Sequence, residues 1–385
     1  MKIMVVLSRV PWPLEKGDKL RAYHLIREWS KNHEVVLFCL TDQPIDPLAE
    51  KKLNEICKQV LIHRLSKWGI YGRLLQNIFG SLPFQVAYFN SNKARNKFDR
   101  FLEENIPDHI FCQLTRTVEF VRKYSVLHKS IDYMDAFSVG MARMAVKAPW
   151  PKSMLMKLEH RRLHNYEALV QDDFNQRFII SDQDKEQMSH VRDMVVVPNG
   201  IDPVFLEEKN QNTRPSIDIL FTGNMAYRPN IESAKLLVRE VMPLVWKSLP
   251  NTKVCLAGAT PTQEVKELSG TNVEITGWVA DIASIYRDTK VFVAPMIVNT
   301  GLQNKLLEAM ACRVPCITTS MANNALGAKP DEEVLIAEEP KDIAQHIITL
   351  LNNPTNALSI GKAGEFFVKN NFDWKASADA FSSKF

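Results

Sequence analysis

The sequence predicts an α/β protein with two domains, each built on a doubly wound parallel sheet. Three observations support this prediction: apolar segments of strand length recur along the chain, segments of helical periodicity separate them, and 385 residues exceed one compact core. Strands that are apolar throughout are typical of parallel sheets, because helices cover both faces of such sheets. A chain of this length divides into domains of roughly 150 to 200 residues each.

Seven apolar segments in the first half of the chain are predicted strands. They occupy residues 2–8, 33–40, 59–65, 108–113, 130–134, 177–181 and 194–199. Each is rich in Val, Ile, Leu or Phe and is bounded by polar or turn residues. The first of them has one Lys before it and no small-residue cleavage site behind it, so we expect a strand there and not a signal peptide.

Six further apolar segments predict the strands of a second domain. They occupy residues 217–223, 253–259, 273–278, 290–296, 315–320 and 333–338. Before the first of them, Pro, Gly and Asn cluster next to a polar stretch, which is typical of a domain boundary. We therefore expect one domain over 1–199, a second over 200–365, and a C-terminal helical segment, 366–385, that could pack on the second domain or cross back to the first.

Composition excludes several classes of protein. Hydrophobic residues make up 45% and charged residues 24% of the chain, as in ordinary globular proteins. No apolar run reaches the roughly 18 residues that a membrane-spanning helix needs, so we expect a cytoplasmic protein. The six cysteines lie mostly in apolar runs without the close pairs that bind zinc, and we expect them to be reduced core residues.

The first domain carries a local excess of basic residues although the formal net charge is only +4. Between Lys58 and Leu102 eight Lys and Arg residues face a single acid, Asp99. Within this region, residues 66–84 place aromatic and aliphatic side chains near helical spacing with Lys67 and Arg73 on the polar side. This pattern predicts either an interfacial helix on an anionic membrane or an amphipathic helix packed on its own domain.

The loop after the first strand lacks the G-x-G-x-x-G fingerprint, which makes a dinucleotide-dependent dehydrogenase improbable. Gly17 and Asp18 instead open a helix whose free backbone N–H groups would attract an anion. An ordinary loop with Asp18 as a helix cap explains the same residues.

Residues 299–316, "NTGLQNKLLEAMACRVPC", carry the clearest chemical signal. Gly301 allows close backbone approach, and a helix begins directly after it. Lys305 and Glu308 are three residues apart and share one helix face. A cation beside free N–H groups suits a diphosphate, and a carboxylate one turn later can accept hydrogen bonds from a ribose diol. The segment is consistent with a nucleotide-sugar site, or with a plain surface Lys–Glu pair.

These residues resemble the group 1, or family four, glycosyltransferases, which are retaining enzymes with the two Rossmann-like domains of the GT-B fold. The segment "G-x-x-x-K-L-L-E-A-M-A" followed by "x-x-V-P" is similar to the family's most specific signature. "VVPNGID", "LFTGNMAYRPNIES" and "GWVADIASIYRDTKVFVAPM" also match the family in order and spacing. The resemblance is strong over about 195–350 and looser before it, where "GDKLRAYHLIREWS", "DYMDAFS" and "EHRRLHNYE" carry it.

The resemblance implies roles for the residues of this segment. Glu308 matches the second Glu of the family's E-x7-E motif and would bind the donor ribose. Gly301, Leu302 and Gln303 would offer backbone contacts to the donor diphosphate. Thr300 stands where the family has the first Glu of that motif, so a carboxylate near the donor sugar is missing.

A second departure from the family concerns the phosphate loop. Gly223 matches the glycine that opens this loop, but Asn224 and Pro229 replace the Arg and Lys that usually follow. Arg228 and Lys305 are the candidates that would supply the missing positive charge. We expect donor binding without a metal ion, because helix termini and basic side chains neutralise the diphosphate.

Acids of the first domain are candidates for the acceptor side. Asp132 and Asp135 lie at the carboxyl end of a predicted strand, where they either face the acceptor or cap a helix. Asp182 and Asp184 suggest a D-x-D metal site, but Ser181 as N-cap with acids in the first helical turn explains them better.

The sequence thus predicts a glycosyltransferase that moves a sugar, of hexosyl type, from a nucleoside-diphosphate sugar to a glycan or lipid-linked acceptor, with retention, in bacterial envelope polysaccharide or glycolipid synthesis. An epimerase of the same fold and a non-catalytic nucleotide-sugar-binding protein are the alternatives. We expect no nucleic acid partner and no cofactor, and a location in the cytoplasm or on the inner face of the plasma membrane. The candidate residues are Lys305, Arg228 and Asp135 for catalysis, Gly223, Asn224, Thr300, Gly301, Leu302, Gln303, Lys305 and Glu308 for the donor, and Gly17, Asp18 and Asp132 for the acceptor.

Overall fold

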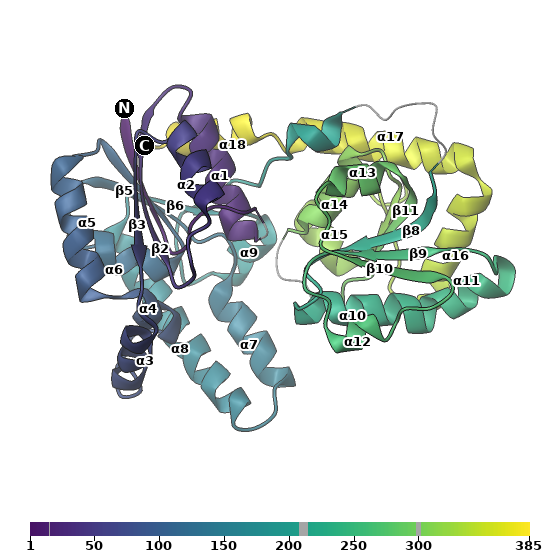
Figure 1. Ribbon diagram of the computed structural model, residues 1–385, viewed down its shortest axis with the longest axis horizontal. Helices are drawn as coiled ribbons and strands as arrows, with labels where there is room; N and C mark the ends of the chain where they lie inside the picture. Colours follow the sequence, from purple (N-terminus) through teal and green to yellow (C-terminus); the bar gives the residue numbers. More distant parts are fainter. Residues whose placement is uncertain (15, 208–214, 298–301) are drawn as a thin grey trace. The chain divides into compact units, whose positions relative to one another are not determined.

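The computed structural model describes residues 1–14, 16–207, 215–297 and 302–385, and they form two units (Figure 1). The first unit comprises Met1–Asn199 together with Trp374–Phe385, and the second comprises Gly200–Asp373. Residues 366–371 complete the last helix of the second unit, so the segment that returns to the first unit begins at Trp374 and not at 366.

The first unit contains a seven-stranded sheet in the order β3-β2-β1-β4-β5-β6-β7, and every pair of neighbouring strands is parallel. The strands are β1 (Lys2–Leu7), β2 (Glu34–Thr41), β3 (Gln59–Arg64), β4 (His109–Gln113), β5 (His128–Asp132), β6 (Gln176–Ile179) and β7 (Met194–Val196). Each lies within a segment predicted as a strand or overlaps one, which confirms the doubly wound parallel sheet.

Helices cover both faces of this sheet (Figure 1). They are α1 (Gly17–Trp29), α2 (Pro47–Ile56), α3 (Lys67–Gln76), α4 (Phe84–Phe89), α5 (Asn92–Glu104), α6 (Val118–Val121), α7 (Phe137–Lys147), α8 (Lys152–Val170) and α9 (Asp182–Gln187). Ser181 caps α9, since its Oγ accepts from the Asp184 N–H at 3.1 Å, as predicted for this acidic turn. The single helix expected over 66–84 ends at Gln76.

Two apolar layers hold the first unit together. Along β1 the alternate residues Ile3 and Val5 belong to one buried cluster, while Met4 and Val6 belong to the other. Successive side chains of a strand point to opposite faces, so this strand is apolar throughout because both of its faces are covered.

The C-terminal helix α18 (Trp374–Ser382) belongs to the first of these layers. Trp29 of α1 donates its indole N–H to the Ala378 carbonyl at 3.0 Å, and the Arg21 guanidinium lies 5.1 Å from the Phe381 ring centroid. The last residues of the chain therefore complete the core of the first unit.

The second unit contains a six-stranded parallel sheet in the order β10-β9-β8-β11-β12-β13. The strands are β8 (Ile217–Thr222), β9 (Val254–Ala257), β10 (Val273–Gly277), β11 (Thr289–Ala294), β12 (Cys316–Thr318) and β13 (Leu335–Ile336). They correspond to the six strands predicted after the domain boundary.

The helices of the second unit also pack on both faces of its sheet (Figure 1). They are α10 (Arg228–Leu236), α11 (Met242–Ser248), α12 (Gln263–Lys266), α13 (Ile282–Arg287), α14 (Asn304–Ala311), α15 (Ser320–Leu326), α16 (Pro340–Asn352) and α17 (Pro354–Asn371). Among the helices described in either unit, none has both the length and the apolar character required to span a bilayer.

Each sheet has one point at which the strand order reverses. In the first unit it lies between β1 and β4, and in the second between β8 and β11. Loops that leave the carboxyl ends of two such strands diverge to opposite faces of the sheet and leave a crevice between them, where open α/β sheets bind ligands.

Candidate functional site

The strongest candidate site lies in the second unit, at the reversal point between β8 and β11. The loop after β8 begins at Gly223, and α14 follows the loop after β11. Residues 298–301 of that second loop lie outside the described residues, and with them the predicted donor residues Thr300 and Gly301. The site is therefore built from the remaining residues of the two loops and of the helices that follow them.

Two glycines allow the loop after β8 to pass close to its neighbour. A Cβ atom on Gly258 would lie 1.9 Å from the Gly223 carbonyl oxygen, and one on Gly223 would lie 2.6 Å from the Asn230 side-chain nitrogen. Contacts this short are not tolerated, so both positions require glycine in this conformation. Gly223, predicted to open a phosphate loop, thus stands at the carboxyl end of β8 beside Asn230.

Lys305 of α14 lies against the loop that follows β8. Its Nζ donates to the Asn230 side-chain oxygen at 2.5 Å and lies 4.8 Å from the Phe221 ring centroid. Asn230 in turn donates its side-chain N–H to the Asn224 carbonyl at 3.0 Å. Through these contacts the Lys305 ammonium connects α14 with the loop that follows β8.

Glu308, one turn along α14, is held by a buried tyrosine. The Tyr286 hydroxyl donates to Glu308 Oε2 at 2.9 Å and lies 2.6 Å from the Thr222 hydroxyl at the end of β8. Leu306, Leu307 and Met310 of the same helix are buried in the core. The apolar positions therefore fix the helix so that Lys305 and Glu308 share its other face, as their spacing predicted.

Burial shifts the pKa values of this pair in opposite directions. Removal from water lowers the pKa of Lys305 to about 7, with Glu308 opposing the shift. Removal from water likewise raises the pKa of Glu308 to about 7, while Tyr286 and Lys305 oppose that shift. Both groups therefore change protonation near neutral pH, and an added anion beside Lys305 would favour its charged form.

The other predicted donor residues within the described part of the chain have structural or surface contacts. Gln303 is the buried N-cap residue of α14, and Leu302 packs against the apolar core. Asn224 accepts the Ala226 N–H at 2.9 Å through its side chain. The Arg228 side chain is 64% exposed and forms ion pairs with Glu232 and Glu264, so its charge is already partly neutralised on the surface.

Sequence reasoning did not identify Asn230 or Tyr286 as site residues. Asn230 carried no distinct signal, because Arg228, Glu232 and Ser233 around it are polar as well. Tyr286 carried none, since an aromatic residue at a core-facing helical position has the same pattern whether or not its hydroxyl serves a site.

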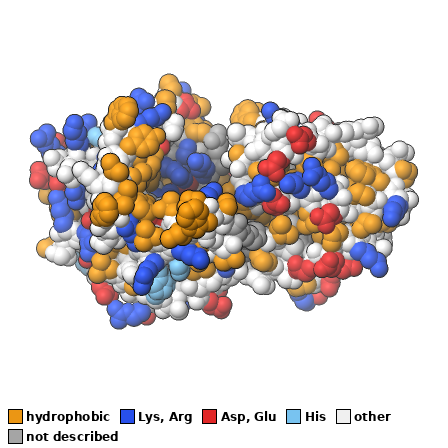
Figure 2. Space-filling view, turned by 90° about the horizontal axis from the view of Figure 1, so that it is seen from below, with side chains coloured by type: hydrophobic (Ala, Val, Ile, Leu, Met, Phe, Trp, Pro, Cys, Tyr) orange, Lys and Arg blue, Asp and Glu red, His pale blue; other side chains and the backbone are white. Residues whose placement is uncertain are grey.

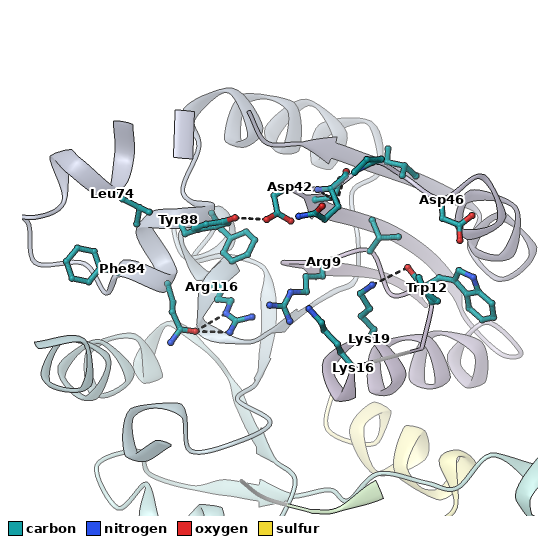
Figure 3. Close-up of a pocket in the computed structure, with 18 residues that line it drawn as sticks. Arg9, Trp12, Lys16, Lys19, Asp42, Asp46, Leu74, Phe84, Tyr88 and Arg116 are labelled. Atoms are coloured by element: carbon teal, nitrogen blue, oxygen red, sulfur yellow. Dashed lines mark hydrogen bonds between the residues drawn. The ribbon is translucent and has the colours of Figure 1, made fainter. Parts of the chain in front are cut away.

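A second candidate site is a pocket of about 590 Å³ within the first unit, at the carboxyl ends of β1, β2 and β4 (Figure 3). Arg9, Lys16, Lys19 and Arg116 line it, and Figure 3 shows Arg9, Lys16 and Arg116 extending toward the same space. The carboxylate of Asp42, which also lines the pocket, accepts the Tyr88 hydroxyl at 2.6 Å.

Arg116 contributes to this pocket a positive charge that is not paired with a carboxylate among the described residues. Its Nε and Nη2 donate to the Gln85 side-chain oxygen at 3.1 and 2.8 Å, and among the described residues no carboxylate lies within ion-pair distance of it. Burial, followed by the nearby charge of Arg9, lowers the pKa of Arg116 to about 10, so it stays charged at neutral pH. Such a pocket favours a ligand with an anionic group.

Two predicted acceptor-side residues hold structural ion pairs. Asp132 is fully buried, and its Oδ2 accepts from Arg21 Nε at 2.6 Å, so its carboxylate faces the core and not an acceptor. Asp18, in the first turn of α1, accepts from Arg9 Nη1 at 2.8 Å. Gly17 starts the same helix at an exposed position where a Cβ atom would meet nothing within 4 Å.

Asp135 follows β5 at its carboxyl end and is partly buried. Burial and the neighbouring carboxylates of Asp184 and Asp132 raise its pKa from 3.8 to about 8. At neutral pH in the free protein this carboxyl therefore holds its proton, which suits a proton donor better than a base.

We expect Asp135→Asn to stabilise the protein at alkaline pH only. The raised pKa means that the folded state keeps a proton that the unfolded state has lost, so stability falls as pH rises from about 4 to about 8. The amide cannot ionise, and its melting temperature should exceed that of the wild type by several degrees at about pH 9, with no gain at about pH 4. Thermal denaturation at the two pH values measures this. Asp379→Asn, at an exposed position of α18, is the control, and an equal effect of Asp135→Asn at both pH values would contradict the assignment.

Comparison with known proteins identifies a family model that matches the segment containing this site. The model of the family described as "Glycosyl transferases group 1" matches residues 216–353, a segment that contains Asn230, Tyr286, Lys305 and Glu308. An uncharacterized 44.6 kDa protein in the cps region of Klebsiella pneumoniae is 23% identical over 417 residues, which cover 100% of this chain and 99% of that protein.

Solved structures resemble the chain along its whole length. Sucrose-phosphate synthase from Thermosynechococcus elongatus superposes with a TM-score of 0.72 at 16% identity, over 100% of this chain and 98% of that one. Anabaena HepE, solved in complex with UDP and glucose, superposes with a TM-score of 0.69 at 14% identity, over 99% of this chain and 98% of that one. These likenesses show the GT-B fold that the sequence predicted.

Proposed function

We propose that the protein transfers a sugar, of hexosyl type, from a nucleoside-diphosphate sugar to an acceptor hydroxyl, because residues 216–353 match the model of the group 1 glycosyl transferases. The observation that carries the proposal is the cluster of Lys305, Asn230 and Glu308 at the strand-order reversal of the second unit. The reaction retains the configuration of the anomeric carbon, as in the family that the sequence resembles.

The donor binds through its diphosphate and its ribose. Lys305 exchanges its contact with Asn230 for the diphosphate, and the first N–H groups of α14 add hydrogen bonds. Glu308, kept in place by Tyr286, accepts hydrogen bonds from the ribose hydroxyls. The complex of Anabaena HepE with UDP and glucose supports a uridine nucleotide as the first donor to try.

Catalysis consists mainly of stabilising the departing diphosphate. As the bond between the anomeric carbon and the phosphate oxygen breaks, negative charge grows on that oxygen, and the Lys305 ammonium neutralises it in a partly water-excluded site. The charges of Lys305 and of the helix terminus take the role that a metal ion has in other transferases, so we propose a reaction without a metal ion or cofactor. The acceptor oxygen forms the new bond to the anomeric carbon while its proton passes to the departing diphosphate, so no side chain of the donor site is assigned as a base.

The acceptor is a glycan or lipid-linked molecule, and the basic pocket of the first unit is where we propose that its anionic group binds. Envelope polysaccharide or glycolipid synthesis in the cytoplasm fits such an acceptor, and the relative from a cps region supports this assignment.

Thermal-shift measurements with UDP, GDP and ADP test the donor site first. A ligand that binds only the folded protein raises the melting temperature, so one of the three should do so in the presence of a chelator. A panel of nucleoside-diphosphate sugars, incubated with the protein in the absence of an acceptor, should then show slow hydrolysis of one nucleotide sugar. Epimerised product would favour an epimerase, binding without turnover would favour a non-catalytic protein, and no shift with any nucleotide would exclude the proposed site.

A further inference from the structure

The first unit exposes large apolar side chains along α3 and in the turn that follows it. Trp68 is 86% and Phe79 97% exposed, and Tyr71, Leu75 and Ile78 are exposed beside them. The opposite side of α3 is packed, since Ile70 is buried and Leu74 lines the basic pocket. The helix therefore presents one apolar face to solvent although its own unit already covers the other.

The hairpin of α7 and α8 exposes a second apolar group. Val146 is 83% and Trp150 78% exposed, and Met154, Leu155 and Leu158 follow along the first turns of α8. Their spacing of one, three and four residues places them on one side of this helix. Packing within the first unit thus does not explain why the tip of the hairpin is apolar.

Hydrogen bonds from α8 join these two groups into one surface. Arg162 donates to the carbonyls of Asn77 and Ile78 at 3.0 and 2.9 Å, and Glu159 accepts the N–H of Phe84 at 2.7 Å. α3 and the α7–α8 hairpin project from the same side of the first unit (Figure 1), and hydrophobic side chains gather over this unit in Figure 2 with Lys and Arg beside them. We call this surface, formed by α3, its following turn and the hairpin tip, the apolar foot.

The charged residues within the two stretches that form the apolar foot are of one sign. Neither residues 56–98 nor residues 136–158 contain an Asp or Glu. Lys67, Lys152 and Lys157 are exposed within these stretches. Aromatic and aliphatic side chains with a rim of Lys and Arg are typical of segments that lie in the headgroup region of an anionic bilayer.

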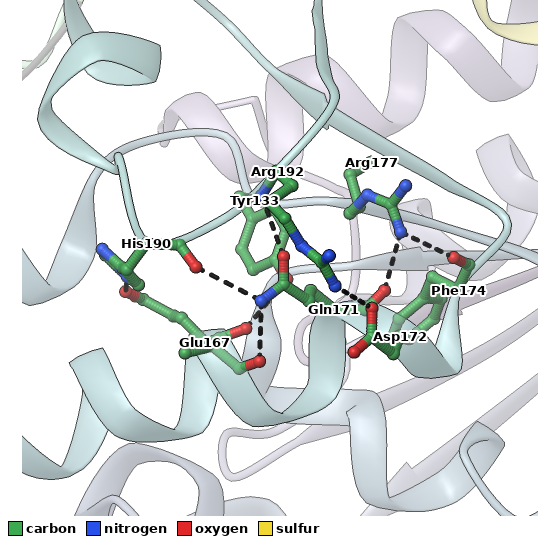
Figure 4. A network of polar contacts seen from close by, with 9 residues as sticks. Tyr133, Glu167, Gln171, Asp172, Phe174, Arg177, His190 and Arg192 are labelled. Atoms are coloured by element: carbon green, nitrogen blue, oxygen red, sulfur yellow. Dashed lines mark hydrogen bonds and ion pairs between the residues drawn. The ribbon is translucent and has the colours of Figure 1, made fainter.

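A polar network fixes the far end of α8 (Figure 4). Glu167 pairs with His190 at 2.7 Å, and the Gln171 side chain donates to the His190 carbonyl and accepts the Arg192 N–H. Arg177 donates to the Gln171 carbonyl at 2.9 Å. Because α8 is anchored at its base to the segments around β6 and β7, its tip can bind a surface with little loss of conformational freedom.

We propose that the apolar foot docks the first unit on a membrane that contains anionic lipids. Aromatic rings and Leu or Met side chains enter the boundary between headgroups and acyl chains, while the lysines contact lipid phosphates. The absence of acidic residues from both stretches favours a lipid surface over a protein partner, since protein interfaces combine charges of both signs. This docking is independent of the donor site in the second unit.

Sedimentation with lipid vesicles tests the proposal on the full chain. The wild type should sediment with vesicles of phosphatidylglycerol and phosphatidylcholine in equal parts, at least about tenfold more tightly than with phosphatidylcholine alone, and salt should release it. The double variants Trp68→Ser with Phe79→Ser, and Trp150→Ser with Met154→Ser, should each bind at least about tenfold more weakly. Leu358→Ser with Phe366→Ser, at exposed apolar positions of α17, is the matched control and should bind like the wild type.

Two measurements keep the outcomes distinct. Thermal denaturation and nucleotide binding should be unchanged in the double variants, because the replaced side chains are exposed and lie in the other unit. Failure of the wild type to sediment with anionic vesicles, or unchanged sedimentation of both double variants, overturns the proposal. A wild-type dimer that dissociates in the double variants, without vesicle binding by either form, also overturns it and assigns the apolar foot to self-association.

Discussion

Lys305→Ala is expected to lower kcat for donor turnover by about a hundredfold to a thousandfold. Lys305 is the cation that lies closest to the proposed diphosphate position, between Asn230 and the Phe221 ring. Charge on the leaving oxygen is greatest in the transition state, so loss of the ammonium should affect kcat more than the donor KM. Steady-state kinetics of donor hydrolysis or transfer measure both constants.

A lysine on the sheet of the same unit provides the control. Lys290 on β11 is exposed and pairs with Asp218 at 2.6 Å, so Lys290→Ala should leave kcat within about twofold. If Lys305→Ala retained more than about a third of the wild-type kcat, Lys305 would not be the group that stabilises the leaving diphosphate.

The lowered pKa of Lys305 gives the same residue a second readout. With a pKa of about 7 in the free protein, its ammonium loses a proton as pH rises through neutrality. Glu308 ionises over the same range, so the contribution of Lys305 is measured as the difference in nucleoside-diphosphate affinity between the wild type and Lys305→Ala, and this difference should fall from about pH 6 to about pH 9. The bound anion favours the protonated form, and binding at neutral pH should take up a proton. Calorimetry in buffers of different ionisation enthalpy detects this uptake, which Lys305→Ala should abolish.

Glu308→Ala is expected to weaken nucleoside-diphosphate binding by about tenfold to a hundredfold and to raise the donor KM in the same proportion. A hydrogen bond to a charged group is worth about 1.5–3 kcal/mol, so the net loss of one such bond to the ribose corresponds to this range. Its loss removes interactions that ground state and transition state share, so kcat should change little. Isothermal titration with the nucleotide found by thermal shift measures the affinity.

Two variants distinguish ribose binding from a structural role of Glu308. Glu308→Gln keeps an acceptor oxygen and should retain part of the affinity, whereas ribose-modified nucleotides lacking one hydroxyl should bind the wild type more weakly and Glu308→Ala unchanged. Equal affinity of Glu308→Ala and the wild type for the unmodified nucleotide would remove this carboxylate from the site.

The sheets were predictable because their strands carry a strong local signal. In β1 every residue after Lys2 is apolar, and in β8 four of the six residues are, as expected of strands covered on both faces, and turn residues mark where each strand ends. The exact division of residues 66–84 was not predictable, because Trp68, Tyr71 and Phe79 have the spacing of a buried helix face while the structure leaves them exposed.

The site was predictable where its geometry is local. Lys305 and Glu308 share a face because they are one helical turn apart, which the sequence states directly. Contacts between distant residues were not predictable in this way: Arg21 and Asp132 are 111 residues apart, and nothing next to Asp132 indicates that a buried guanidinium occupies its carboxylate. The same holds for Tyr286 and Glu308, which meet because α13 and α14 pack against each other.

The return of α18 to the first unit makes the order of folding differ from the order of synthesis. During synthesis residues 1–199 precede the second unit, yet their core lacks Trp374, Ala378 and Phe381 until the second unit has been made. The second unit, complete at Asp373, has all of its sequence before the first unit does. The first unit is thus completed after the second, and a nascent chain that stops at Asp373 lacks the residues that contact Trp29 and Arg21.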